Sequence, residues 1–211
     1  MGIEKGFTIV ELLVAMAIGL LVMTSIYSVY YSQQKSYVAQ EQVLAMQQNL
    51  RAGMTMLTRD IRMAGYDPTG NAGAGILAAA AGSLQVTMDL TEDGGLGGTN
   101  ENVTYLHYDS DADGTNDALG RDTGGGSQMV AENIDALRFD YFDSNGAATA
   151  VPANIRSVQV TMVARTGRGD PGYVDDDVYA NQSGVTIFGP ANDSNRRRLL
   201  SRQIKCRNMG L

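Results

Sequence analysis

The chain has 211 residues and a net charge of −7, from 23 acidic side chains against 16 Lys and Arg. This length accommodates one globular domain plus an extension. The acidic balance argues against a general nucleic-acid binder, which needs a basic surface to displace the counterions of phosphates. Cys206 is the only cysteine, so the fold is not a disulfide scaffold.

A long apolar stretch follows a short polar leader. The leader is residues 1–6 and carries Lys5, and the apolar character runs from Phe7 to Tyr31. This run is long enough to cross a hydrocarbon core as a helix, and it is too long for the apolar centre of a secretory signal. Lys5 favours a cytoplasmic N-terminus. We therefore predict a membrane-spanning helix over residues 7–31.

One acidic residue, Glu11, interrupts this apolar stretch. A carboxylate at the centre of a bilayer costs about 3 kcal/mol. Either Glu11 reaches the cytoplasmic interface from near the helix end, or it has a cationic partner. Cleavage after Gly6 would create such a partner, because the new α-amine of Phe7 is cationic at neutral pH. Pairing Glu11 of one subunit with the Phe7 amine of another would recover the desolvation cost of both groups.

The helix is expected to continue to Ala64. No proline occurs before Pro68, and residues 32–66 are rich in good helix formers. Apolar residues at spacings of three, four or seven form one stripe there: Val43, Leu50, Met54, Leu57, Ile61 and Ala64. Gly65 and Pro68 predict the end of the helix, and the stripe requires a cover from the rest of the chain.

Five later segments alternate apolar and polar residues, as strands with one buried face do. They are residues 84–88, 103–108, 137–141, 156–164 and 199–206. Strands that follow one another without helices between them favour an antiparallel sheet. The predicted fold is therefore α+β, with the long N-terminal helix packed on an antiparallel β-rich head over residues 67–211. The helix is membrane-spanning in its first half and amphipathic over residues 32–66.

The sequence contains no catalytic constellation. His107 is the only histidine and lies in a predicted strand, which favours a structural role; without it no Ser-His-Asp triad can be built. Cys206 has no obvious base near it. The glycine-rich runs lack the strand–loop–helix context of a nucleotide site. We therefore predict that the protein is not an enzyme.

An acidic loop is the one candidate metal site. Its pattern, D-x-D-x-D-G-x-x-D, matches the first nine positions of an EF-hand loop, and calcium binds six to eight oxygens of this kind. The candidate ligands are Asp109, Asp111, Asp113, Thr115 and Asp117. Gly120 stands where the bidentate Glu is required, so Asp122 or Glu132 would have to supply a ligand. The alternative is a solvated acidic turn. For a second acidic run, residues 175–177, we predict a solvated loop.

The C-terminal region is basic although the chain as a whole is acidic. Its cationic residues are Arg196, Arg197, Arg198, Arg202, Lys205 and Arg207. Two interpretations remain open. The segment is either a solvated strand or loop, or a docking patch for an acidic neighbour.

The segment Gly6–Leu12 resembles the class III signal of type IV prepilins, with Gly before the cut, Phe after it and Glu fifth in the mature chain. The resemblance implies cleavage between Gly6 and Phe7 and N-methylation of Phe7. A prepilin peptidase at the cytoplasmic membrane face would carry out both steps. Glu11 would then be the assembly residue.

Three further segments resemble PilW-type minor pilins: Arg59–Tyr66, Val130–Tyr141 and Ile155–Arg165. This resemblance implies a low-abundance subunit that helps to start pilus assembly. Its partners would be prepilin peptidase, the major pilin, other minor pilins and the assembly platform in the inner membrane. The protein would span the bacterial inner membrane once, with a periplasmic head, and then enter the filament on the cell surface. Residues 166–195 carry no such resemblance.

Two other functions stay open at this point. A minor pseudopilin of a type II secretion system would have the same signal and the same long helix. A membrane-anchored calcium-binding module or sensor would make Glu11 incidental, and the intact cut site argues against it. Nucleic acid is not the expected partner, although a role in DNA uptake is compatible with a pilin and with the basic C-terminal segment.

Overall fold

The structure is a computed structural model that describes residues 6–210. Its one α-helix, α1, spans Ile9–Met63 and confirms the predicted long helix to within two residues at each end. The chain divides into two compact units between Glu41 and Gln42, and α1 runs through both. The predicted leader lies outside the described residues apart from Gly6.

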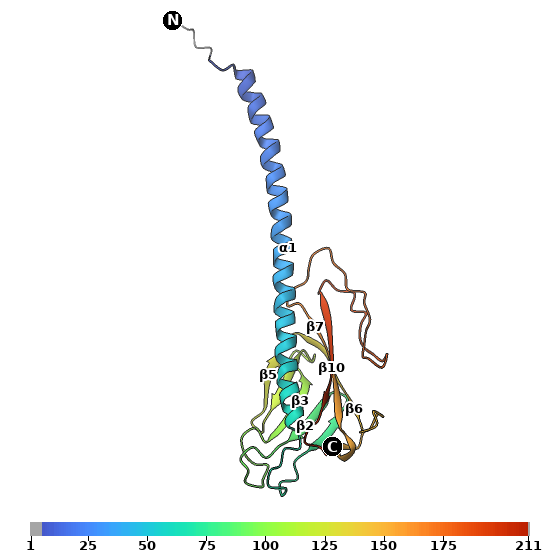
Figure 1. The fold of residues 1–211 in the computed structure, drawn as a ribbon. Helices are drawn as coiled ribbons and strands as arrows, with labels where there is room; N and C mark the ends of the chain where they lie inside the picture. Colours follow the sequence, from blue (N-terminus) through green and yellow to red (C-terminus); the bar gives the residue numbers. More distant parts are fainter. Residues whose placement is uncertain (1–5, 211) are drawn as a thin grey trace. The chain divides into compact units, whose positions relative to one another are not determined.

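The second unit contains ten strands in antiparallel sheets (Figure 1). They are β1 (Ile76–Ala80), β2 (Ser83–Thr87), β3 (Asn102–Tyr108), β4 (Ala118–Asp122), β5 (Ser127–Ala131), β6 (Ile134–Phe142), β7 (Ser157–Arg165), β8 (Tyr179–Ala180), β9 (Thr186–Phe188) and β10 (Arg197–Lys205). A five-stranded sheet has the order β1-β2-β3-β4-β5, a three-stranded sheet has the order β10-β7-β6, and β8 pairs with β9. The α+β prediction is confirmed, and each of the five predicted strands is present.

The apolar stripe of α1 packs on these sheets. Leu57 and Ile61 are fully buried, and only Val43 of the predicted stripe is partly exposed. Gly53 brings the helix close to the sheets, because a Cβ on this residue would lie 3.0 Å from Leu119 Cδ2 of β4 and 3.3 Å from Ala131 Cβ of β5. Figure 1 shows this part of α1 alongside β3 and β5. One core therefore joins the helix to the strands.

The end of α1 is closed by the residues that follow it and by the C-terminal segment. Gly65 adopts the left-handed conformation, with φ of +81°, and its N–H donates to the carbonyl oxygen of Thr87 at 3.0 Å. The last carbonyl groups of a helix have no partner within the helix. The side-chain amide of Asn208 donates to two of them, those of Arg62 at 3.2 Å and Met63 at 3.4 Å.

A buried charge also lies between α1 and the five-stranded sheet. Asp60 is 3% exposed and accepts hydrogen bonds from the hydroxyl of Tyr105 on β3 at 2.8 Å and from Nε of Arg121 on β4 at 2.9 Å. Burial and the Asp60 carboxylate both raise the pKa of Tyr105, so this hydroxyl stays protonated and donates. The apolar stripe gives no indication of this polar cluster.

The basic C-terminal segment was predicted to be solvated or to dock an acidic neighbour, and this prediction is wrong for Arg197. Its side chain is only 3% exposed and forms three ion pairs: with Asp135 at 2.6 Å, Asp175 at 2.9 Å and Asp193 at 2.6 Å. Asp175 is fully buried, so the prediction of a solvated loop is wrong for this residue. The hydrogen bonds from Arg197 are the main cause that lowers the pKa of Asp193 to about 2.

The same network fastens the long segment over residues 166–195. The N–H of Thr166 donates to the carbonyl of Arg196 at 2.9 Å, so the two ends of the segment meet. Within the segment, Asp175 bridges to Asp193, and both carboxylates point to Arg197. A stretch with little regular structure thus has a defined place against β10.

Candidate functional site

The predicted cleavage bond lies just ahead of α1. Gly6 and Phe7 are exposed, outside any helix or strand, and the Phe7 side chain is 93% exposed. Among residues 6–210, a Cβ on Gly6 would meet no atom within 4 Å, so packing against the described residues does not require glycine here. The structure therefore presents this peptide bond in an accessible segment.

Glu11 forms a capping box with Thr8 at the start of α1. The Glu11 carboxylate accepts hydrogen bonds from the Thr8 N–H at 2.8 Å and from the Thr8 hydroxyl at 3.0 Å, and the Glu11 N–H donates to the Thr8 hydroxyl at 3.2 Å. A Thr followed three residues later by Glu is the sequence signature of this arrangement. The T-x-x-E pattern of Thr8 and Glu11 is therefore a sequence signal for the start of α1 that the predicted helix start at Phe7 did not use.

The capping box fixes where the negative charge of Glu11 lies. Its carboxylate folds back to the first turn of the helix, one residue from Phe7, where cleavage would leave an α-amine. The N-terminus of a helix also favours a negative charge, because the unpaired N–H groups there are partly positive. Glu11 therefore has a structural role within one chain, and its charge lies next to the predicted cleavage point.

The rest of this half of α1 exposes apolar side chains on every face. Of the described residues, only α1 is long and apolar enough to cross a membrane, and its apolar stretch is not buried by the chain itself. Exposed members include Ile9, Leu12, Leu13, Met16, Ile18, Leu20, Leu21 and Met23. A helix that is apolar all round needs lipid or other helices around it.

Two hydroxyl groups in the apolar stretch are satisfied within the helix. Thr24 Oγ1 donates to the carbonyl of Leu20 at 2.8 Å, and Ser25 Oγ donates to that of Leu21 at 2.9 Å. Such bonds matter in lipid, where water cannot serve polar groups. The residues that dilute the apolar run are therefore compatible with a membrane or a filament core.

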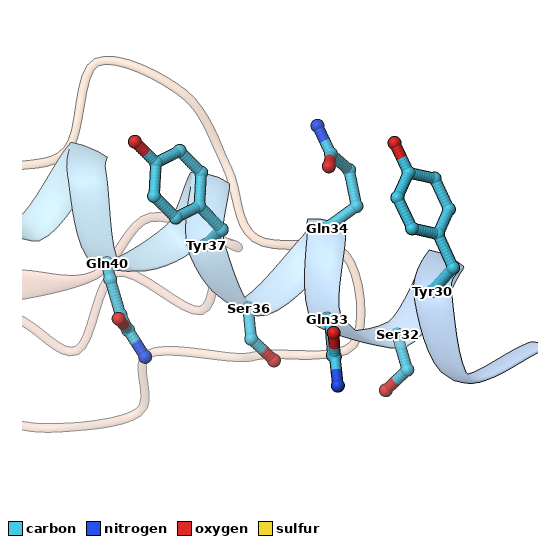
Figure 2. A pocket seen from close by; sticks show the side chains of 7 residues that line it. All are labelled: Tyr30, Ser32, Gln33, Gln34, Ser36, Tyr37 and Gln40. Atoms are coloured by element: carbon cyan, nitrogen blue, oxygen red, sulfur yellow. The ribbon is translucent and has the colours of Figure 1, made fainter.

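Tyrosines mark the end of the apolar stretch. Tyr27 and Tyr31 stack with their ring centroids 6.5 Å apart, and Lys35 Nζ lies 4.9 Å from the centroid of Tyr31. A hollow follows on the next turns of the helix. Figure 2 shows its lining residues, with Tyr30, Gln34 and Tyr37 on one side of the helix and Ser32, Gln33, Ser36 and Gln40 on the other. Tyrosines beside a Lys are typical of a membrane–water interface.

The acidic loop brings three of its predicted ligands together. One carboxylate oxygen each from Asp109, Asp111 and Asp113 lie within 4.8 Å of one another. Hydrogen bonds from backbone N–H groups, that of Gly114 first, lower the pKa of Asp109. The N–H of Asp113 lowers the pKa of Asp111, but desolvation and the neighbouring carboxylates outweigh it and raise this pKa overall. The charges thus repel one another in a cluster that a cation would stabilise.

The other predicted members of this loop are placed differently. Asp117 accepts from the N–H of Ser110 at 3.0 Å, which closes the loop, while Thr115 donates its N–H to Asp113 at 2.8 Å. Gly120 lies in β4, and Asp122 is paired with Thr104 at the far end of the β3–β4 ladder. Asp122 therefore cannot complete the loop, because the ladder separates it from Asp109.

The remaining chemically active residues hold the fold together. His107 Nε2 lies 2.7 Å from the carbonyl oxygen of Ile134, as expected for a structural histidine. Cys206 is buried, and burial raises the pKa of its thiol to about 11. This thiol is therefore a poor nucleophile at neutral pH.

Several basic side chains near the C-terminus border one hollow. They are Arg62, Arg156, Arg202, Lys205 and Arg207, and Asp143 is the only acidic residue among the described residues that line it. None of the five basic side chains forms an ion pair within residues 6–210. The docking patch for an acidic neighbour was predicted for the C-terminal basic residues, and on this surface it stays a prediction for Arg202, Lys205 and Arg207. Arg196 and Arg197 form ion pairs within the chain instead.

Comparison with known proteins supports the N-terminal motif and the fold separately. Residues 1–27 match the family model of the prokaryotic N-terminal methylation motif. No curated protein matches the chain. Among solved structures, a type IV-like pilin of Thermus thermophilus matches with 16% identity and a TM-score of 0.50, over 77% of this chain and 97% of that one. The chain therefore joins a prokaryotic N-terminal methylation motif to a type IV pilin-like fold.

Proposed function

We propose that the protein is a minor pilin, a structural subunit that takes part in initiating and assembling type IV pili. The observation that carries this proposal is the uncovered apolar surface of α1 directly behind the accessible Gly6–Phe7 bond. A helix of this kind serves as a membrane anchor before assembly and as a packing surface within a filament. The β-rich head is too large and too polar to share that role.

The proposal includes a place in the cell and a set of partners. The chain would span the bacterial inner membrane once, with its head in the periplasm, until the assembly platform moves it into the filament. Prepilin peptidase, the major pilin and other minor pilins are the expected partners. Glu11 supports this assignment, because its charge lies beside the point where a neighbouring Phe7 amine would have to be neutralised.

A minor pseudopilin of a type II secretion system is the second candidate, because the methylation motif and the fold suit both filaments. The resemblance of three segments to PilW-type minor pilins favours the pilus. Deleting the gene separates the two candidates. Loss of surface pili and twitching with normal secretion supports the pilus, and loss of secreted proteins with normal piliation supports the secretion system.

Processing at Gly6 gives the first testable prediction. Protein isolated from native membranes is expected to begin at N-methylated Phe7, because the bond is exposed and the motif matches. N-terminal mass analysis measures this directly. An intact Met1 in cells with an active prepilin peptidase would contradict the proposal, and cells without the peptidase provide the control.

We further propose that the loop over residues 109–117 binds calcium. Three carboxylates with oxygens inside 4.8 Å, joined by a Gly turn, suit the flexible oxygen shell of this ion. At a calcium concentration about a hundred times the dissociation constant, binding stabilises the folded chain by about 2.7 kcal/mol.

Thermal melts of the full chain in detergent test this loop. Calcium is expected to raise the melting temperature by several degrees, and magnesium to act weakly because it keeps its waters. The paired change Asp111→Ala and Asp113→Ala is expected to remove one bound calcium without unfolding the head, because the loop is exposed. Equal calcium binding by the variant and the natural chain would leave the loop as a solvated turn.

A further inference from the structure

Two fully buried carboxylates lie at the ends of the loop between β2 and β3. Asp89 and Glu101 are both 0% exposed. No Lys or Arg occurs between Arg62 and Arg121 in the sequence, so no basic residue near them in the chain balances their charge. Burying a carboxylate without a compensating partner is costly. The two carboxylates differ in how many of their oxygens accept hydrogen bonds.

Glu101 is satisfied by the loop itself. One carboxylate oxygen accepts from the N–H of Leu90 at 3.0 Å and from the N–H and hydroxyl of Thr91 at 2.8 and 2.7 Å, and the other accepts from the N–H of Gly98 at 2.6 Å. These hydrogen bonds, with those from Thr91 the largest cause, lower the pKa of Glu101. Its lone pairs are therefore used within the loop.

Asp89 is satisfied on one side only. Its Oδ2 accepts from the N–H of Gly94 at 3.0 Å and lies 3.5 Å from the Thr69 hydroxyl. Its Oδ1 is buried and has no hydrogen-bond donor among residues 6–210. A buried carboxylate oxygen without any donor costs the full desolvation penalty of that group. A further group must therefore contact Oδ1 for an ionised Asp89 to be stable.

The β2–β3 loop and the segment after α1 carry several side chains with oxygen atoms. The Thr69 hydroxyl that approaches Asp89 also donates to the Asp67 carboxylate at 3.0 Å, so the two carboxylates share this side chain. Glu92 and Asp93 lie on the same loop, and Glu92 accepts from the hydroxyl of Tyr66 at 3.4 Å. The loop carries no histidine, cysteine or basic side chain. Its ligand set is thus oxygen only, and it is acidic.

We propose that Asp89 anchors a calcium site between the β2–β3 loop and the segment that follows α1. An all-oxygen set selects a hard cation, and calcium accepts more ligands and looser geometry than magnesium. Asp89 Oδ1 is the central ligand. Thr69, backbone carbonyls of the glycine-rich loop and Asp67 are the other candidates. Each Asp67 oxygen already accepts one backbone N–H, from Gly70 at 2.8 Å and from Gly73 at 3.0 Å, so Asp67 would contribute through its remaining lone pairs.

This site is distinct from the loop over residues 109–117. There the carboxylates are exposed or half-buried, whereas Asp89 is buried and its Oδ1 has no hydrogen-bond donor among residues 6–210. The Asp89 site does not depend on the pilus proposal. A bound ion would tie Asp67, which lies just beyond the turn that ends α1, to the loop after β2. Calcium would therefore stiffen the end of the head where the helix stops.

Direct calcium binding by the full chain in detergent tests the site. The chelator-treated chain is dialysed against calcium, and bound ion is counted for the natural sequence, for Asp89→Asn, and for the matched control Asp111→Ala with Asp113→Ala. Asp89→Asn keeps the shape and removes the charge. Asp89→Asn is expected to bind one calcium fewer per chain than the natural sequence. The control is expected to keep part of the calcium-dependent rise in melting temperature, and Asp89→Asn is expected to lose that part. Unchanged binding by Asp89→Asn overturns the proposal.

A measurement on the natural chain covers the case in which Asp89→Asn fails to fold. A protease that cuts after Glu is expected to cleave at Glu92 several-fold more slowly in calcium than in chelator, because the ion orders the loop. Mass spectrometry identifies the cut. Equal cleavage rates in calcium and in chelator would overturn the site, and would leave a buried water as the partner of Asp89 Oδ1.

Discussion

Glu11→Gln is expected to be inserted and cleaved normally but to fail in starting filaments. Gln at this position keeps the capping box, because its amide oxygen can still accept from the Thr8 N–H and hydroxyl. It loses the negative charge that would neutralise a neighbouring Phe7 amine in a desolvated filament core. The measurement is surface piliation in a strain that carries only the variant, together with N-terminal analysis of the membrane-bound protein.

Two companion variants separate charge from capping. Thr8→Ala keeps the Glu11 charge and removes the hydroxyl of the capping box, which costs about 1 kcal/mol of helix stability, and it is expected to support pili. Glu11→Ala removes both features and is expected to fail. Full piliation in Glu11→Gln with loss in Thr8→Ala would reverse the interpretation and leave capping as the function of Glu11.

Arg197→Ala is expected to lower the free energy of unfolding by about 3–5 kcal/mol, the usual cost of removing one partner from a buried ion pair. The change would leave the carboxylate of Asp175, which is 0% exposed, without its guanidinium partner, whereas Asp135 keeps its ion pair with Arg165 at 2.9 Å. It would also remove two of the ion pairs that hold the segment over residues 166–195 against β10, those with Asp175 and Asp193. Urea titration of the full chain in detergent, followed by the strand signal in circular dichroism, gives the free energy.

The neighbouring Arg198 supplies the control. It is exposed and forms no ion pair within the described part of the chain, so Arg198→Ala is expected to change stability by less than about 0.5 kcal/mol. Similar losses in both variants would show that the Arg197 network does not stabilise the fold.

The same network predicts a dependence on acid. The folded pKa of Asp193 is about 2, below its ordinary value of 3.8. As the pH falls, Asp193 therefore becomes protonated in the unfolded chain before it does so in the folded chain. Its contribution to the free energy of unfolding is fully present above about pH 4 and is lost as the pH falls toward 2. Comparing the free energy of unfolding of the natural chain with that of Asp193→Asn between pH 5 and pH 2.5 isolates this contribution, because the variant removes only the Asp193 carboxylate from the network. Parallel stability curves would contradict it.

The helix and the main strands were predictable because their patterns are local. The stripe of α1 follows the helical period, and β7 has Val158, Val160 and Met162 on one face. Three strands of the five-stranded sheet were missed for physical reasons. β1 is mostly alanine, β5 has a largely exposed half, and β4 contains Gly120. A Cβ on Gly120 would lie 2.7 Å from the Tyr108 ring on β3, so this glycine is placed by pairing and not by local propensity.

The candidate sites were likewise predictable only where their residues are close together in the sequence. The cleavage motif and the acidic loop are contiguous in sequence and could be read from it. The Arg197 network could not, because Asp135 is 62 residues away and reaches Arg197 only through the pairing of β6, β7 and β10. The unmatched oxygen of Asp89 likewise depends on how the β2–β3 loop folds over it. Side-chain type alone would have placed both Arg197 and Asp175 in solvent.

The segment over residues 166–195 is a closed loop, because its two ends are hydrogen-bonded to each other. Because Thr166 and Arg196 already hold the ends together, lengthening the segment changes mainly the entropy of closing it, and doubling its length costs only about 0.6 kcal/mol. Asp175 and Asp193 must keep their places, but the turn at Gly172 has open space around it. A peptide epitope inserted there is expected to mark the assembled head without disturbing its sheets.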